Sequence, residues 1–319
     1  MEKTYNLFKK FLPMISIIAF CGMGFALLSL LFYYNEATIS IDFKNVIPIM
    51  AVLFLLAAFA ACVYFTLKID KLHITRIKKT SGFTKFSVFL VGILATALFL
   101  YNFLQFVLQP VFTLAVPATL FKTLRMGFSI QFIVYLALEI LPKKIKHKAV
   151  IIPKWIKPFM AVCTLIWAIF GLLGIYFFTG LPTTNIFKLA YIFYYVLVII
   201  FFYFEIKFEL LTPNHRGYVL SAMLLFSFTF IFSGSMTFAK FLGRLSNVTI
   251  SDFEIFLSVA LGIYALAKMM AIQNTLKFVM SRNEGSGRHR HHRHHRSSST
   301  TENIEPATIQ IEDDSTSNK

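Results

Sequence analysis

The chain alternates between long apolar runs and short polar segments. Eight runs hold 18 to 24 residues each, at 11–34, 46–67, 86–108, 124–141, 159–178, 186–204, 218–239 and 253–272. A helix of roughly 20 apolar residues crosses the ~30 Å hydrocarbon core of a bilayer, and lipid forces the backbone to satisfy its own hydrogen bonds. The pattern therefore predicts an all-α integral membrane protein, a bundle of about eight transmembrane helices within residues 1–280.

The first run follows two lysines, as the apolar core of a signal peptide would. Its 24 residues exceed the roughly 7–15 residues of such a core. We therefore expect a retained first helix.

The composition changes after residue 280, where the chain ends in "GSGRHRHHRHHRSSSTTENIEPATIQIEDDSTSNK" from Gly285 onward. So few large apolar residues cannot bury enough surface to fold alone, and we expect residues 281–319 to form a disordered cytoplasmic tail. Five histidines between Arg288 and Arg296 could hold a metal, and the arginines could meet anionic lipid. A solvated tail without a dedicated ligand is the preferred interpretation.

Composition agrees with a membrane protein. Hydrophobic residues make up 57% of the chain and charged residues 14%, against about 45–50% and about 25% in soluble domains. The net charge of +16 arises within residues 1–280, where 25 Lys and Arg face nine Asp and Glu. A basic chain can indicate nucleic-acid binding, but here the charge lies in short loops between apolar runs. We expect the lipid bilayer as partner and no nucleic acid.

The loops show which way the spans run. The N-terminus and the second, fourth and sixth loops carry 17 Lys and Arg, whereas the alternate loops carry six. Cytoplasmic loops hold the basic excess, so both termini are predicted to be cytoplasmic. Within the outer segment between Gln109 and Thr123, Pro110 and Pro117 oppose a continuous helix. Val111–Leu120 is then interfacial, the preferred interpretation, or a re-entrant loop.

Three acids lie at the predicted cytoplasmic ends of spans. Glu205 and Glu209 are four residues apart and share one helix face, and Glu139 occupies the last turn of the fourth span. They could form a proton- or cation-binding site. The preferred interpretation is a polar collar at the headgroups, with Glu139 paired locally to Lys143.

Lys268 lies deeper, 15 residues into the eighth span and so about 22 Å along its axis. Its stem could extend and carry the ammonium to the interface, which is the preferred interpretation. The alternative is an ion pair inside the bundle with Glu205 or Glu139.

Asn102, Gln105 and Gln109 form a polar stripe on the third span. Such groups turn toward other helices in lipid, where they hold helices together. Packing is the preferred role, and a small polar cavity is the alternative.

Motifs for chemistry are missing from the sequence. Cys21, Cys62 and Cys163 all lie in apolar runs and have no metal-ligand spacing. The sequence contains no HExxH, GxSxG or P-loop motif. We therefore predict no cofactor, no metal site and no enzymatic activity.

Four segments resemble a loosely defined group of polytopic membrane proteins of Firmicutes-type bacteria. They are "IWAIFGLLGIYF" (166–177), "LPTTNIFKLAYIFYYV" (181–196), "FEIKFEL" (204–210) and "HRGYVLSAM" (215–223). The resemblance implies a multi-span architecture in a bacterial plasma membrane and assigns no activity.

Two function classes remain ahead of an embedded enzyme. The preferred class is a small-solute or ion transporter of the permease kind. Its candidate polar interior comprises Asn102, Gln105, Gln109, Glu139, Glu205 and Lys268. The alternative is a membrane sensor or scaffold that acts through its cytoplasmic loops and tail.

Overall fold

A computed structural model describes residues 2–36, 38–69, 81–108, 116–140, 144–145, 148–149, 153, 155–178, 182, 185–210, 214–245, 248 and 250–291. The chain divides into two units, Met1–Phe278 and Val279–Lys319. The first unit holds seven candidate membrane spans and the eighth as far as Phe278.

Eight helices in the described residues are long and apolar enough to cross a membrane, which confirms the predicted fold class. Six of them are α1 (Glu2–Phe32), α2 (Val46–Lys68), α3 (Gly82–Leu108), α4 (Val116–Ile140), α5 (Ile156–Phe178) and α6 (Ile186–Glu209). The seventh span joins α7 (His215–Phe228), the π-helical turn η2 (Thr229–Gly234) and α8 (Ser235–Phe241), and the eighth lies in α9 (Asp252–His291).

Two short antiparallel hairpins connect helices. Strands β1 (Tyr34–Asn35) and β2 (Ser40–Ile41) lie between α1 and α2. Strands β3 (Lys144–Ile145) and β4 (Lys148–Ala149) lie between α4 and α5. Both hairpins fall in segments that the hydrophobic pattern assigns to loops.

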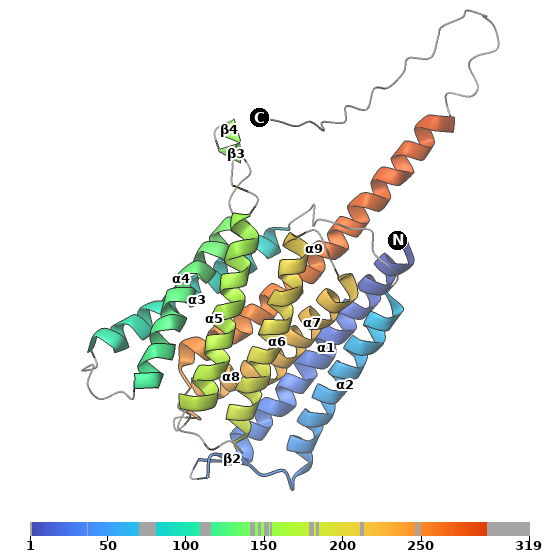
Figure 1. Ribbon diagram of the computed structural model, residues 1–319. Coiled ribbons are helices and arrows are strands. Elements are labelled where there is room, and N and C mark those ends of the chain that lie inside the picture. Colours follow the sequence, from blue (N-terminus) through green and yellow to red (C-terminus); the bar gives the residue numbers. More distant parts are fainter. Residues whose placement is uncertain are drawn as a thin grey trace, which may run out of the picture. The chain divides into compact units, whose positions relative to one another are not determined.

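The helices form a bundle in which sequence neighbours pack side by side (Figure 1). Helices α1 and α2 pack together, as do α3, α4, α5 and α6 in succession, and α7 contacts both α2 and α6. The apolar windows of the seventh and eighth spans are 78% and 72% buried, against 22–44% for the other six. These two spans therefore form the centre of the bundle.

Residue size explains this arrangement. The seventh span is rich in serine, threonine and glycine, and small residues let helix backbones approach closely in lipid. A Cβ added at Gly262 of α9 would overlap Thr229 Oγ1 of η2. Large apolar side chains such as Phe20, Leu56 and Phe89 are instead exposed on the peripheral helices, as is typical of a surface that lipid covers.

Most helices extend beyond the predicted spans, and the ends of α4 and α9 change what we expected of the segments beside them. Helix α4 begins at Val116, before the expected start at residue 124, because Pro117 lies in the first turn, where its missing N–H removes no bond. The interfacial or re-entrant prediction for 111–115 lies outside the described residues. Helix α9 continues to His291, so residues 281–291 are helical although we expected disorder from 281; an established helix gains one bond per added residue.

Candidate functional site

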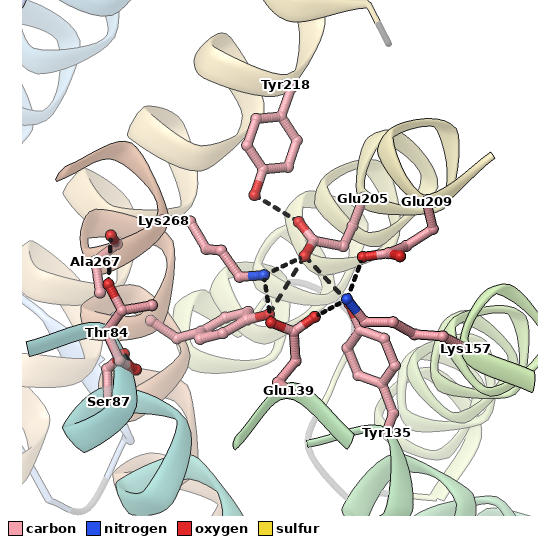
Figure 2. Close-up of polar contacts among 11 residues, drawn as sticks. Thr84, Ser87, Tyr135, Glu139, Lys157, Glu205, Glu209, Tyr218, Ala267 and Lys268 are labelled. Atoms are coloured by element: carbon pink, nitrogen blue, oxygen red, sulfur yellow. Dashed lines mark hydrogen bonds and ion pairs between the residues drawn. The ribbon is translucent and has the colours of Figure 1, made fainter. Parts of the chain in front are cut away.

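Lys268 lies at the centre of a buried group of charges. Its Nζ lies 2.6 Å from Glu205 Oε1 and 3.1 Å from Glu139 Oε2, as Figure 2 shows. The lysine side chain is only 6% exposed. The prediction that it extends to the membrane interface is therefore wrong. The alternative prediction, an ion pair inside the bundle, is confirmed, and Lys268 pairs with both acids. Helices α4, α6 and α9 surround the ammonium group and separate it from the surface.

Lys157 of α5 extends this group toward the surface. Its Nζ lies 2.7 Å from Glu139 Oε1 and 2.6 Å from Glu209 Oε1. Exposure of the side chains rises from 3% at Glu205 to 22% at Glu209 and 32% at Lys157. The charged groups thus form a continuous chain of contacts from a sealed interior to the surface of the bundle.

Three tyrosines surround the Glu205 carboxylate. The Tyr135 hydroxyl donates to Oε1 at 3.1 Å and the Tyr218 hydroxyl to Oε2 at 2.5 Å. The Tyr264 hydroxyl donates at 3.4 Å, and its ring lies 5.2 Å from Lys268 Nζ. Hydrogen bonds to an ionised acceptor are about twice as strong as neutral ones, so these hydroxyls stabilise a charged Glu205.

Eight residues from five helices form this group of contacts, and we call them the Glu205 cluster: Tyr135, Glu139, Lys157, Glu205, Glu209, Tyr218, Tyr264 and Lys268. Helix periodicity explains the set, because residues four apart share one face. Tyr135 and Glu139 are so related on α4, and Tyr264 and Lys268 on α9. Close packing fixes the helix pair α6–α7, since a Cβ at Gly217 would overlap the ring of Phe204.

The predicted polar collar needs correction. Glu205 is 2% exposed and Glu139 is part-buried with Lys157 and Lys268 as partners, so neither acid lies in the headgroup zone by itself. Counting residues along one helix gives depth but not the neighbouring helices that close over a side chain. Lys143, the expected local partner of Glu139, lies outside the described residues.

The cluster contains an excess acid. Carboxylate oxygens of Glu139, Glu205 and Glu209 lie within 4.8 Å of one another, a spacing that suits a cation. Two ammonium groups already lie between them, so a metal ion would have to displace a lysine. Three carboxylates against two ammonium groups leave one negative charge when all are ionised, and burying an uncompensated charge is costly. A proton or a monovalent cation would balance the cluster.

A second buried group, the Arg125 cluster, comprises Arg125, Tyr195 and Glu254. Arg125 Nη2 lies 3.0 Å from Glu254 Oε1, and the Tyr195 hydroxyl bonds both side chains. The guanidinium also lies over the rings of Trp167 and Tyr195, at 5.6 Å and 5.5 Å. This arrangement balances one positive charge with one negative charge.

The polar stripe of the third span is described in part. Asn102 and Gln105 are half-buried, and Gln105 Nε2 donates to Tyr101 on the same helix at 2.6 Å. Gln109 lies outside the described residues. Of the predicted polar interior, the structure brings together Glu139, Glu205 and Lys268.

Several members of these clusters escape sequence reasoning. The charge pattern places Lys157 among loop lysines, although it lies in the first turn of α5, and it places Arg125 in a loop, although Arg125 lies inside the fourth span. A signal for the tyrosines exists in the spacing, since Tyr135 and Tyr264 each precede a charged residue by four positions. No comparable signal pairs Arg125 with Glu254.

Comparisons with known proteins add no family to this geometry: no family model, no curated protein and no solved structure matches the chain. The resemblance to polytopic proteins of Firmicutes-type bacteria stays a prediction. The eight apolar helices fit a multi-pass membrane protein.

Proposed function

We propose that this protein is a transporter of a small solute or ion, and that the Glu205 cluster is its ion-handling element. The observation that carries the proposal is the chain of ion pairs from sealed Lys268 and Glu205 to part-exposed Lys157 and Glu209. Ionisable side chains inside a membrane are costly, and they commonly mark ion paths and proton relays.

The mechanism follows from the excess of one carboxyl group over the two ammonium groups of the Glu205 cluster. With Lys157 and Lys268 charged, the cluster is neutral only when one of three carboxyl groups holds a proton or a cation is bound. Glu209, at the exposed end, can exchange that proton with water, and it is connected to Glu205 through Lys157, Glu139 and Lys268. A solute that binds near Glu205 would change which carboxyl is protonated, and this links solute and ion movement.

On this proposal both termini face the cytoplasm of a bacterial cell. The support is the excess of Lys and Arg in alternate loops together with the even number of spans. The exposed end of the Glu205 cluster then opens to the cytoplasm, because Glu209 ends the sixth span.

Electrical recording on proteoliposomes tests the function. Purified protein is exposed to panels of amino acids, sugars, organic acids and inorganic ions, with and without a pH gradient. We expect one class to give a transient current that Lys268→Met abolishes. The matched control is Lys277→Met, since Lys277 is an exposed lysine on the same helix.

The alternative, a sensor or scaffold, gives a different result. No panel member would then produce a current larger than that of empty liposomes. Deletion of residues 292–319 would remove the function of the protein in cells, whereas Lys268→Met would preserve it. That pattern would contradict the transport proposal.

A further inference from the structure

One strip of the central helix α7 is left uncovered by its neighbours. From Tyr218 to Phe228 every residue of α7 is buried except Leu220 and Leu224, which are half-buried. The two leucines are four positions apart and so share one helix face. We call them the uncovered strip, because they are the part of an otherwise enclosed stretch of helix that another molecule can reach.

The uncovered strip faces the junction of α2 and α6. Helix α7 packs against both of these helices. On one side, Ser227 Oγ lies 3.8 Å from Cys62 Sγ of α2. On the other side, Gly217 lies against the ring of Phe204 of α6, which a Cβ at this position would overlap. At about 100° per residue, the two leucines lie between these two contact directions around α7.

Aromatic rings cover this junction in the middle of the bundle. The ring centroids of Phe59 on α2 and Phe193 on α6 lie 5.8 Å apart, and those of Phe193 and Phe228 on α7 lie 5.0 Å apart. Closer to the last turn of α2, Val63 and Leu67 are 45% and 71% exposed. The junction is thus covered at mid-bundle, and its apolar side chains are exposed toward the last turn of α2 and the first turn of α7.

Two cations lie at the exposed end of the junction. Arg216, in the first turn of α7, is exposed, and its Nε donates to Ile69 O at the end of α2 at 3.0 Å. Lys207 Nζ lies over the ring of Tyr203, 4.7 Å from its centroid. Lys207 follows Phe193 by almost four helical turns, so it lies on the side of α6 that contacts α2.

The helices of the junction offer these two cations no acid. Helices α2 and α7, residues 46–68 and 215–228, contain no Asp or Glu, and α6 contains Glu205 and Glu209. Both glutamates belong to the Glu205 cluster, where Glu205 pairs with Lys268 and Glu209 with Lys157. An exposed apolar strip that ends at uncompensated positive charge has the charge and polarity to bind an anionic amphiphile.

We propose that the junction of α2, α6 and α7 binds one molecule of an anionic phospholipid such as phosphatidylglycerol. An acyl chain lies along Leu220 and Leu224, and the phosphate lies between Lys207 and Arg216. Basic sites between membrane helices bind anionic lipid headgroups in this way. A zwitterionic lipid binds less well, because its own ammonium group lies beside the two basic side chains.

This site does not rest on the transport proposal. Its residues lie outside the Glu205 cluster, and a sensor would bind such a lipid as well as a transporter would. Lipid binding is measured without any solute, so failure of one proposal leaves the other standing.

Native mass spectrometry of the purified full-length protein tests the site. Protein in detergent is titrated with phosphatidylglycerol, or with phosphatidylcholine of the same acyl chains, and the fraction with one bound lipid is measured. Phosphatidylglycerol should half-saturate the protein at a concentration about tenfold or more below that of phosphatidylcholine. Lys207→Gln should raise this concentration about fivefold, which corresponds to about 1 kcal/mol per basic residue at a membrane surface.

Lys68→Gln is the matched control. Lys68 is an exposed lysine in the last turn of α2 and also lies over a tyrosine ring, that of Tyr64 at 5.3 Å. Tyr64 contacts Phe11 of α1, so this pair lies on the α1 side of α2 and away from the junction. Lys68→Gln should leave the affinity for phosphatidylglycerol unchanged.

Leu220→Trp fills the uncovered strip and should abolish binding of the lipid. If this variant fails to fold, Lys207→Gln on the surface still tests the site. Equal affinities for the two lipids, or equal effects of Lys207→Gln and Lys68→Gln, would overturn the proposal. So would full binding by a folded Leu220→Trp, or displacement of the lipid by equimolar glycerol 1-phosphate, which carries the phosphate without the acyl chains.

Discussion

Two buried charge clusters share the helices α4, α6 and α9, yet their charges are arranged in opposite ways. Ten residues separate their members on each helix, roughly 15 Å along the axis. The pairs are Arg125 and Tyr135 on α4, Tyr195 and Glu205 on α6, and Glu254 and Tyr264 on α9. The Arg125 cluster is a single balanced ion pair, whereas the Glu205 cluster is a branched network.

The difference concerns charge balance and access. Arg125 and Glu254 neutralise each other, and Tyr195 bonds both of them, so no further ion is needed. The Glu205 cluster joins three acids to two lysines and reaches the surface through Lys157. A balanced pair holds helices together, whereas an unbalanced network with one exposed end can exchange an ion.

Removing Lys268 is expected to have the largest effect on stability. Lys268→Met leaves Glu205 without its ion-pair partner in a sealed site, and breaking a buried pair in this way costs about 3–5 kcal/mol. Chemical or thermal unfolding in detergent should show the loss. Lys277→Met, on the exposed face of the same helix, should change stability by less than about 0.5 kcal/mol; equal losses in the two variants would contradict the assignment.

Double variants separate a pair from a network. In the Arg125 cluster, adding Glu254→Gln to Arg125→Met should recover most of the loss, because replacing a whole buried pair is often neutral. In the Glu205 cluster, adding Glu205→Gln to Lys268→Met should recover less, because Glu139 has also lost Lys268. Unfolding free energies of the single and double variants provide the measurement. Equal recovery in both clusters would show that the network behaves as a simple pair.

Tyrosine variants should have intermediate effects. Tyr218→Phe removes a 2.5 Å bond to Glu205, and hydrogen bonds to charged groups contribute about 1.5–3 kcal/mol. Tyr264→Phe removes only a 3.4 Å contact and should cost less. The order of the two losses in unfolding experiments checks the geometry, and a larger loss for Tyr264→Phe would contradict it.

Glu209→Gln should change stability least. Its partner Lys157 is 32% exposed, and ion pairs that solvent reaches contribute about 0–1 kcal/mol. The variant should nevertheless remove the exposed member of the proposed relay, so solute currents should lose their dependence on the pH gradient. Solute currents that keep their dependence on the pH gradient, together with a large loss of stability, would contradict the role that we assign to Glu209.

The sequence predicts the bundle well because lipid imposes a length rule on each segment separately. All eight spans appear where apolar runs of bilayer length occur, including the eighth, where Glu254 and Lys268 interrupt the apolar run. The position of Lys268 along its helix also follows from counting residues at about 1.5 Å each. These properties depend on one helix at a time.

The site depends on several helices, and the sequence predicts it only in part. Glu205 and Lys268 are recognisable as possible partners because both lie at similar depth, although 63 positions separate them. Lys157 is not recognisable as a partner of these acids, since nothing along α5 indicates that it faces Glu139 and Glu209. The π-turn also escapes prediction, because TFIFSG carries the same apolar pattern as the regular helix around it.

Infrared spectroscopy of the protein in lipid, across a range of pH, tests most directly whether the Glu205 cluster holds an exchangeable ion. We predict a protonated-carboxyl band that disappears as pH rises and that Glu139→Gln, Glu205→Gln or Glu209→Gln weakens or shifts. The absence of such a band at every pH, or a band that none of the three variants changes, would contradict an exchangeable proton in this cluster.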